Sequence, residues 1–356
     1  MIDFRYHIVS LISVFLALAV GISLGAGPLK ETIGDTLTGQ VEGLRAEKED
    51  LRAQLDETGG DLAAADAFVS AAGERLLVGT LTDRRVALVL LDEVPEDQVA
   101  ALTERLAQAG ASVSATATVN DTWTDPALAT YRRTLAGTLV SYLDRPPAAD
   151  AGTEAELAEA LVAGLVGADP AAPNALSENA SSLLDVLAEG DQALVTFAQD
   201  VTRPADAIVV VSGTSEEPAD ETATAGPDPD GFAPQLALVG AAERLSAGVV
   251  VTGASRSGDD LVAAVRGDDA LADVVTTVVD SATVTGQVTV PLALAADIGG
   301  RPGSYGYGDD RAALPPAVQL PPVDRNPTVP DAAAGDVPDA TQGETPGGEV
   351  QPGGDG

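Results

Sequence analysis

The sequence predicts an α/β protein in which an N-terminal transmembrane helix and a coiled coil precede a doubly wound, mostly parallel sheet. An uncharged apolar run follows His7, a heptad pattern follows that run, and strand-like segments then alternate with helix-like segments. The predicted boundaries are 1–29 for a short N-tail and membrane anchor, 30–72 for the coiled coil, 73–313 for the α/β domain, and 314–356 for a disordered tail rich in Pro, Gly and Asp.

The apolar run from Tyr6 to Leu29 is long enough to cross a bilayer. A cleavable secretion signal has a shorter apolar region before a site of small residues, and residues 25–27 (Gly-Ala-Gly) resemble such a site. The length of the run favours an anchor that is retained. Lysine and arginine on the two flanks do not decide the orientation, but a short N-tail before a long domain suits a single-pass protein of the cell membrane or envelope with most of its chain extracytoplasmic.

Small residues recur every four positions in the membrane run, at Ala17, Gly21 and Gly25. This spacing places them on one face of a helix, where a second membrane helix can approach closely. The same spacing also arises by chance in glycine-rich spans. We therefore interpret this face as a candidate for helix pairing.

The segment after the membrane run carries a heptad seam. Its members follow one another by alternating steps of four and three residues, with one step skipped at Thr58: Leu37, Val41, Leu44, Lys48, Leu51, Leu55 and Leu62. A lysine in such a seam sets the register at some cost in stability. The seam predicts a homo-oligomer, most simply a parallel dimer, or a partner helix of another envelope protein; the alternative is an amphipathic helix that packs on its own domain.

Strand and helix patterns alternate after Gly59-Gly60, which we expect to break the helix. Continuous apolar runs predict buried strands, and 3.6-residue periodicity between them predicts helices. The strands are expected at 84–92, 111–119, 205–213, 248–255 and 273–281, and the helices at 95–110, 127–143, 154–166, 178–189, 234–248 and 258–267. Residues 214–231 carry six acidic and no basic residues and are expected to form a mobile acidic loop.

Composition excludes several classes of function. The net charge of −36, from 55 acidic and 19 basic residues, repels phosphate backbones and argues against nucleic acid as a partner. The chain has no cysteine, one histidine (His7) and one methionine (Met1), so no Ser-His-acid triad and no cysteine-based metal site can form in the domain. We expect no enzymatic activity and no bound cofactor.

Other chemical signals are weak. Ser255 or Ser257 is expected to cap a helix, and residues 299–310, with Tyr305 and Tyr307, to form a structural loop. The acidic pairs at 259–260 and 268–269 match no calcium loop and are interpreted as surface charge. A small-ligand site at the carboxyl edge of the sheet stays open, because doubly wound sheets often bind ligands there, but no residue identifies it.

Residues 1–37, "MIDFRYHIVSLISVFLALAVGISLGAGPLKETIGDTL", and the "LRAEKEDLRAQL" heptads at 44–55 closely resemble the start of the MctB-type copper transporter family of actinobacteria. The α/β region and "GSYGYG" at 303–308 are also similar to that family. The resemblance implies an envelope protein of copper homeostasis, described in the family as a pore-forming factor in copper efflux. Another branch of the resemblance implies a membrane-bound partner of cell-separation proteins that acts on envelope hydrolases through the coiled coil.

Copper chemistry limits how such an envelope protein could take part in copper homeostasis. Cu(I) prefers thiolate and thioether ligands and Cu(II) favours imidazole, and only Met1 and His7 offer such groups. Copper is therefore expected as a transported ion rather than as a side-chain-bound cofactor, and one membrane helix encloses a pore only if several copies assemble. The predicted function is copper homeostasis or efflux; the alternative is a coiled-coil scaffold or regulator of cell-wall remodelling and cell separation.

Overall fold

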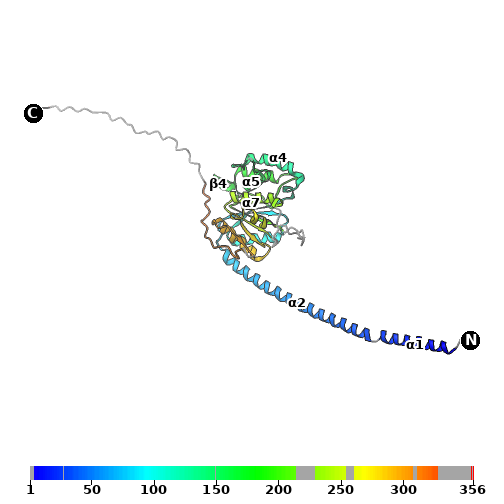
Figure 1. Ribbon diagram of the computed structural model, residues 1–356. Helices are drawn as coiled ribbons and strands as arrows, with labels where there is room; N and C mark the ends of the chain where they lie inside the picture. Colours follow the sequence, from blue (N-terminus) through cyan, green and yellow to red (C-terminus); the bar gives the residue numbers. More distant parts are fainter. Residues whose placement is uncertain are drawn as a thin grey trace. The chain divides into compact units, whose positions relative to one another are not determined.

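The computed structural model describes residues 4–26, 28–148, 150–213, 229–253, 260–307 and 311–327, together with residues 354 and 356. For residues 26, 28–38, 229 and 230 only the backbone is described. The chain divides into two units, residues 1–68 and residues 69–356, which are described separately (Figure 1).

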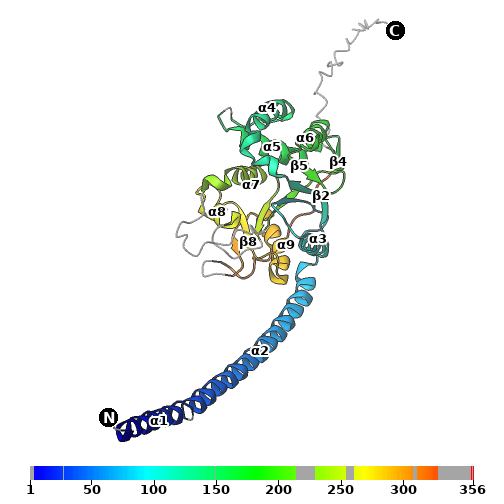
Figure 2. The ribbon, with the colours of Figure 1, turned by 90° about the vertical axis from the view of Figure 1, so that its right-hand side faces the viewer.

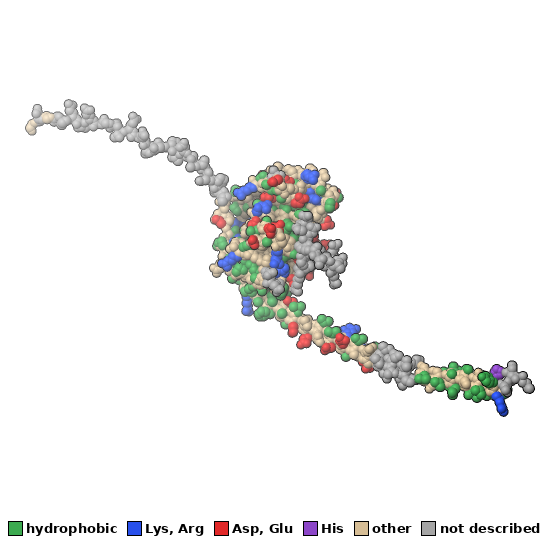
Figure 3. Space-filling view, viewed as in Figure 1, with side chains coloured by type: hydrophobic (Ala, Val, Ile, Leu, Met, Phe, Trp, Pro, Cys, Tyr) green, Lys and Arg blue, Asp and Glu red, His purple; other side chains and the backbone are tan. Residues whose placement is uncertain are grey.

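The first unit begins with α1 (Phe4–Ala26), an apolar helix. The 22 residues Phe4–Gly25 have a mean hydropathy of 2.5, and this is the one helix among the described residues that is long and apolar enough to cross a membrane. At 1.5 Å per residue it spans about 33 Å, close to the thickness of a bilayer core. Its side chains are exposed in the single chain, and Figure 3 shows hydrophobic groups along its length. The prediction of an N-terminal apolar helix is confirmed.

The helix α2 (Pro28–Leu77) occupies the rest of the first unit and continues into the second. Proline at its first position is favourable, because that residue would have no helical partner for its N–H group. The expected break at Gly59-Gly60 is wrong, since the helix runs through both residues. Each glycine costs about 1 kcal/mol in a helix, and the alanine-rich residues that follow supply strong helix formers. The single chain shows the helix; a coiled coil stays a prediction.

The second unit is built on a seven-stranded sheet with the order β5-β2-β1-β6-β7-β8-β9. All neighbouring pairs are parallel except β2 and β5, which are antiparallel. The strands are β1 (Arg85–Leu91), β2 (Ser112–Val119), β5 (Val195–Phe197), β6 (Ala207–Ser212), β7 (Val249–Gly253), β8 (Thr276–Val279) and β9 (Ser304–Tyr305). A two-stranded sheet of β3 (Ala168–Asp169) and β4 (Ala172–Leu176) accompanies it. The predicted mixed α/β fold with a mostly parallel sheet is confirmed.

Helices cover both faces of the large sheet (Figure 2). They are α3 (Glu96–Gln108), α4 (Ala129–Leu139), α5 (Thr153–Val166), α6 (Glu178–Ala188), α7 (Ala233–Leu245), α8 (Leu261–Gly267) and α9 (Val284–Ile298). Alternate residues of β1 point to opposite faces: Val89 joins the core with α4 to α8, and Leu88 joins the core with α3, α9 and the end of α2. All seven residues of β1 are buried, as the continuous apolar run predicts.

Four elements were not expected from the sequence: the β3–β4 hairpin, β5, α9 and β9. The helix α9 contains Thr, Val and an internal proline, Pro291, which lower helix propensity. Burial compensates, because most residues of α9 lie in the core. Val288 of α9 packs closely on α2: a Cβ added at Gly73 would lie 2.6 Å from a methyl carbon of the Val288 side chain. The glycine-rich segment interpreted as a loop contains β9, in which Tyr305 is buried.

Residues 314–327, the first part of the predicted disordered tail, lie against the α/β domain. They contain no helix or strand, as their Pro-rich composition predicts, but Leu320 packs on the core and Arg325 pairs with Asp206. Disorder is therefore the wrong description of this stretch, because a few side chains fasten an irregular backbone. Residues 328–353 and 355, and residues 214–228 of the acidic loop, lie outside the described residues.

Candidate functional site

The predicted pairing face of α1 is present on the helix surface. Ala17, Gly21 and Gly25 are exposed, and a Cβ added at either glycine would meet nothing within 4 Å. Residues four apart lie on one side of a helix, so these three form a shallow strip on which another backbone can lie closely. No second helix covers the strip in the described part of the chain.

The predicted seam on α2 is an exposed apolar stripe in the first unit. Val41, Leu44, Leu51, Leu55 and Leu62 keep between 44% and 71% of their surface exposed. Lys48 is exposed between them, and the side chain of Leu37 lies outside the described residues. Large apolar side chains repeated on one helix face normally pack against another element. All five are exposed within the first unit, and packing on the chain's own domain stays an alternative prediction.

The carboxyl edge of the sheet is the place where a doubly wound fold would bind a ligand. Asp92 follows β1, Asn120 and Asp121 follow β2, and Gln235 of α7 joins them around a cavity of about 40 Å³. Desolvation and the charge of Asp121 raise the pKa of the Asp92 carboxyl group. The Gln235 Oε1 atom is buried and has no hydrogen-bond partner among the described residues. The cavity has room for about one water molecule, so this edge shows polar groups but no described pocket of ligand size.

The other side-chain signals in the sequence have local explanations. Asp260 caps α8 by accepting a hydrogen bond from the Ala263 N–H group at 2.9 Å. Asp268 accepts from the Ala270 and Leu271 N–H groups in a turn. Ser255, Ser257 and Asp259 lie outside the described residues. The cap is therefore an aspartate, and Asp260 and Asp268 serve a helix end and a turn.

A larger groove of about 340 Å³ lies between α5 and α6. Its lining includes Glu159, Ser177, Asn179 and Leu183. Glu159 is buried and paired with Arg244 at 3.0 Å. Asp144 and Arg145 also line the groove, which is therefore a mixed polar and apolar surface in which the buried charge of Glu159 is already paired.

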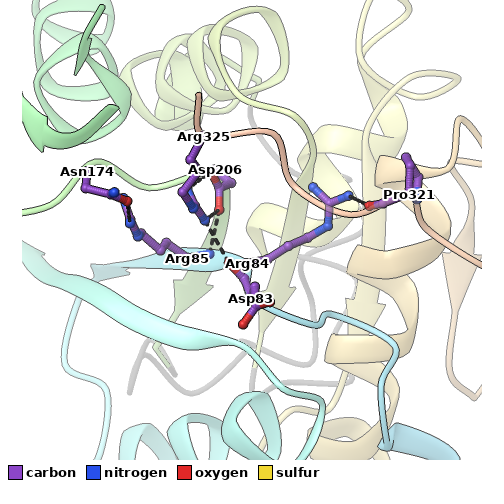
Figure 4. A network of polar contacts seen from close by, with 7 residues as sticks. All are labelled: Asp83, Arg84, Arg85, Asn174, Asp206, Pro321 and Arg325. Atoms are coloured by element: carbon purple, nitrogen blue, oxygen red, sulfur yellow. Dashed lines mark hydrogen bonds and ion pairs between the residues drawn. The ribbon is translucent and has the colours of Figure 1, made fainter. Parts of the chain in front are cut away.

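A polar network at the amino edge of the sheet fastens the C-terminal segment (Figure 4). Arg325 donates to both carboxylate oxygens of Asp206, at 3.1 and 2.7 Å, and to the carbonyl of Asp83 at 2.7 Å. The Arg85 N–H group also donates to Asp206, at 2.7 Å. This two-pronged arginine–carboxylate arrangement is the geometry in which such pairs are strongest. One carboxylate before β6 therefore joins the start of β1 to the last described segment.

Two more arginines crowd this network. Burial lowers the pKa of Arg84 and of Arg85, and the charge of Arg325 lowers both further. Arg84 donates to the carbonyl of Pro321 at 3.2 Å, and Arg85 donates to the side chain of Asn174. The network was not predicted from the sequence; the visible signal was a charged residue at or directly before the start of two buried strands, Arg84 and Arg85 at β1 and Asp206 at β6. The contacts of this network are structural, and we call its central group, Asp83, Asp206 and Arg325, the clasp.

A half-buried carboxylate at the same edge, that of Asp297, gives a pH-dependent prediction. Burial raises the pKa of Asp297, while hydrogen bonds from the Thr276 hydroxyl (2.6 Å) and the Val249 N–H group (2.7 Å) lower it, and the net direction is upward. The folded state therefore binds this proton more tightly than the unfolded state. The stability that protonation contributes is present below the ordinary pKa of 3.8 and is lost as pH rises through the raised value.

Thr276→Val removes a donor to this carboxylate. We expect it to lower the free energy of unfolding by about 1–2 kcal/mol at pH 7, where Asp297 is charged, and by less near pH 3.5, where it is protonated. Denaturant titrations at the two pH values, followed by the fluorescence of the single tryptophan Trp123, would measure the difference. An equal loss of unfolding free energy at both pH values would contradict a raised pKa of Asp297 in the folded state.

Metal ligands do not gather in the described part of the chain: it contains no group of three or more His, Asp or Glu side chains that could hold an ion. His7, the one imidazole, lies exposed on α1. The residues described thus fit neither a soft Cu(I) site nor an imidazole Cu(II) site.

Comparison with known proteins identifies the family. The family described as "Copper transport outer membrane protein, MctB" matches residues 1–316. The copper transporter MctB of Mycobacterium tuberculosis (strain H37Rv) is 31% identical over 324 residues, covering 86% of this chain and 97% of that protein. The copper transporter MctB of Mycobacterium leprae is 28% identical over 334 residues, covering 88% and 99%. An apolar N-terminal helix followed by the α/β domain lies within this match, and the chain belongs to the MctB copper transport protein family.

Proposed function

We propose that this protein is a single-pass envelope membrane protein that contributes to copper homeostasis or efflux and performs no catalytic step. The observation that carries the proposal is the family match, which includes α1 and nearly all of the described α/β domain. The relatives are named copper transporters, and α1 is long and apolar enough to serve as a membrane anchor. In this proposal the short N-tail is inside and the α/β domain is extracytoplasmic.

The proposed contribution does not rest on a copper site in one chain. The soft and imidazole ligands that copper prefers amount to Met1 and His7 in the whole sequence. A single helix cannot enclose a path for an ion, so the protein would act through assembly. The exposed seam of α2 and the small-residue strip of α1 are the two surfaces of the first unit that suit assembly.

The decisive experiment measures cell-associated copper by mass spectrometry after modest copper loading. A deletion strain is expected to accumulate more copper than its parent, and the intact gene is expected to restore the parental level. The double variant Leu44→Asp, Leu51→Asp is expected not to restore it, because two charges interrupt the seam. Ala46→Asp with Ala53→Asp is the matched control, since it adds the same charge on the opposite face of α2.

The outcomes separate two functions. Unchanged copper in the deletion strain would overturn the copper proposal. A cell-separation defect in the same strain, absent with the Ala46 and Ala53 control and present with the Leu44 and Leu51 variant, would favour the second candidate: a scaffold or regulator of cell-wall remodelling that works through the seam. The specific observation behind this candidate is the exposed apolar stripe on α2.

A further inference from the structure

We infer that two copies of this chain pair through α2 in parallel and in register, with Glu47 of each copy against Arg52 of the other. The inference rests on the proposed assembly through the seam and adds the partner, its direction and its register. The side chains involved are exposed positions of α2 within the first unit, from residue 39 onward.

The spacing of the seam assigns each residue a heptad position. A step of three leads from position a to position d, and a step of four leads from d to the next a. Val41, Lys48, Leu55 and Leu62 therefore occupy a, and Leu44, Leu51 and Thr58 occupy d. The first described heptad places a β-branched residue at a and leucine at d, the combination that favours two parallel strands. All the apolar members are exposed on the single helix, so a second helix can cover them.

The charges beside the seam select the direction of the second helix. In a parallel pair, position g of one helix faces position e of the other, five residues further along. Glu47 is at g and Arg52 at e, so a parallel pair in register forms two Glu47–Arg52 contacts of opposite charge. Gln40 at the preceding g position faces Arg45 of the other helix without repulsion. Among these g–e contacts only the one between Asp61 and Asp66 of the other helix joins like charges.

An antiparallel pair over the same stretch brings like charges together. Position e then faces position e, which sets Arg45 against Arg52 of the other helix. Exposed ion pairs stabilise little by themselves. Over residues 40–58, however, the parallel pair has two attractive contacts and the antiparallel pair has two repulsive ones, and this difference favours one direction. The pattern of Glu47 and Arg52 thus favours the parallel arrangement.

Lys48 fixes the register within that arrangement. In register, the two Lys48 side chains share one layer, and each can extend its ammonium group out of the seam toward Glu47 of the other helix. A shift by one heptad would instead place Lys48 in a layer with Val41 or Leu55 of the partner, away from its matching layer. A single lysine at an a position therefore penalises shifted pairs, at a cost in overall stability.

Cysteine cross-linking of the full-length protein in membranes tests direction and register. The chain contains no cysteine, so one introduced thiol gives an unambiguous product. Val41→Cys is expected to form a disulfide-linked dimer on mild oxidation, because equivalent a positions adjoin in a parallel pair. Ala46→Cys, on the outer face of α2, is the matched control and is expected to cross-link far less. Leu55→Cys provides a second a position if Val41→Cys is poorly made.

An antiparallel pair would give a different product. It would place Val41 near Thr58 of the other helix, so membranes that contain both Val41→Cys and Thr58→Cys chains would yield the mixed dimer, and Val41→Cys alone would not cross-link. That result, or equal cross-linking by Val41→Cys and Ala46→Cys, would overturn the inference.

Charge exchange tests the Glu47–Arg52 contact itself. In the Val41→Cys background, Glu47→Arg is expected to slow cross-linking by about tenfold, because it sets two arginines against each other on both sides of the dimer. Adding Arg52→Glu should restore the original rate. Glu49→Arg makes the same charge change at an outer position and should have little effect. Failure of the double exchange to recover would overturn the assignment of the contact.

These readouts are independent of copper. Cross-linking as described together with unchanged copper in the deletion strain would leave the paired helix standing and remove the copper proposal. A copper defect in the deletion strain together with an antiparallel cross-linked product would leave the copper proposal standing and overturn the parallel pairing.

Discussion

Asp206→Ala is expected to lower the free energy of unfolding of the α/β domain by about 3 kcal/mol, the cost of removing one partner from a largely buried ion pair. Its carboxylate is the shared acceptor for Arg325 and the Arg85 N–H group, and both members of the Arg325 pair are only 18% exposed. Without it, Arg84, Arg85 and Arg325 would remain close together with their mutual repulsion uncompensated.

Denaturant unfolding followed by Trp123 fluorescence is the direct measurement, because this tryptophan is buried in the core of the same unit. Asp185→Ala is a suitable control, since Asp185 is exposed on α6 and surface substitutions usually change stability by less than about 0.5 kcal/mol. The C-terminal segment should also become accessible to protease near Arg325 in the Asp206 variant. Equal stability of the two variants would show that the clasp contributes nothing measurable.

Gly286→Ala is expected to destabilise the domain by about 3 kcal/mol, the upper end of the usual cost of overpacking a core position. A Cβ at this position in the first turn of α9 would lie 2.2 Å from the carbonyl oxygen of Asp280 and 2.6 Å from its carbonyl carbon. These are backbone atoms at the end of β8, so they cannot rotate away. The substitution would have to push α9 off the sheet.

Gly137→Ala in α4 is the matched comparison for this substitution. A Cβ there would meet nothing within 4 Å, so the same chemical change should stabilise the domain by about 0.5–1 kcal/mol through helix propensity. Opposite signs in two otherwise identical substitutions, measured in one denaturation series, would confirm the close approach of α9. Similar values for both would contradict it.

The parts of the fold that local patterns determine could be predicted from the sequence. The buried runs gave β1, β6, β7 and β8, and helical periodicity gave α3 to α8, because period and hydrophobicity reside in consecutive residues. The helix α9 escaped this reasoning because Thr, Val and Pro291 resemble a strand or a break, and only its burial against α2 and the sheet makes a helix favourable. The antiparallel edge strand β5 is three residues long, too short to show a period.

The candidate functional surfaces also divide into those that could be predicted from local patterns and those that could not. The strip of Ala17, Gly21 and Gly25 and the seam of α2 are properties of single helices, so their spacing is visible in the sequence and the structure shows both exposed. The clasp joins Asp83, Asp206 and Arg325, which lie more than a hundred residues apart in sequence. No local pattern relates them, and only the parallel order of β1 beside β6 brings two of them to one edge.

The clasp has a mechanical consequence. Arg325 holds both the carbonyl of Asp83, between α2 and β1, and the carboxylate of Asp206, before β6. A pull applied between the end of α2 and the chain beyond residue 327 would therefore reach these contacts first and pass along one edge of the domain. Once Arg325 separated from Asp83 and Asp206, the force would pass to the contacts of Pro321 with Arg84 and of Leu320 with the core. The C-terminal segment would therefore detach in steps, while the hydrogen bonds between the strands carried little tension.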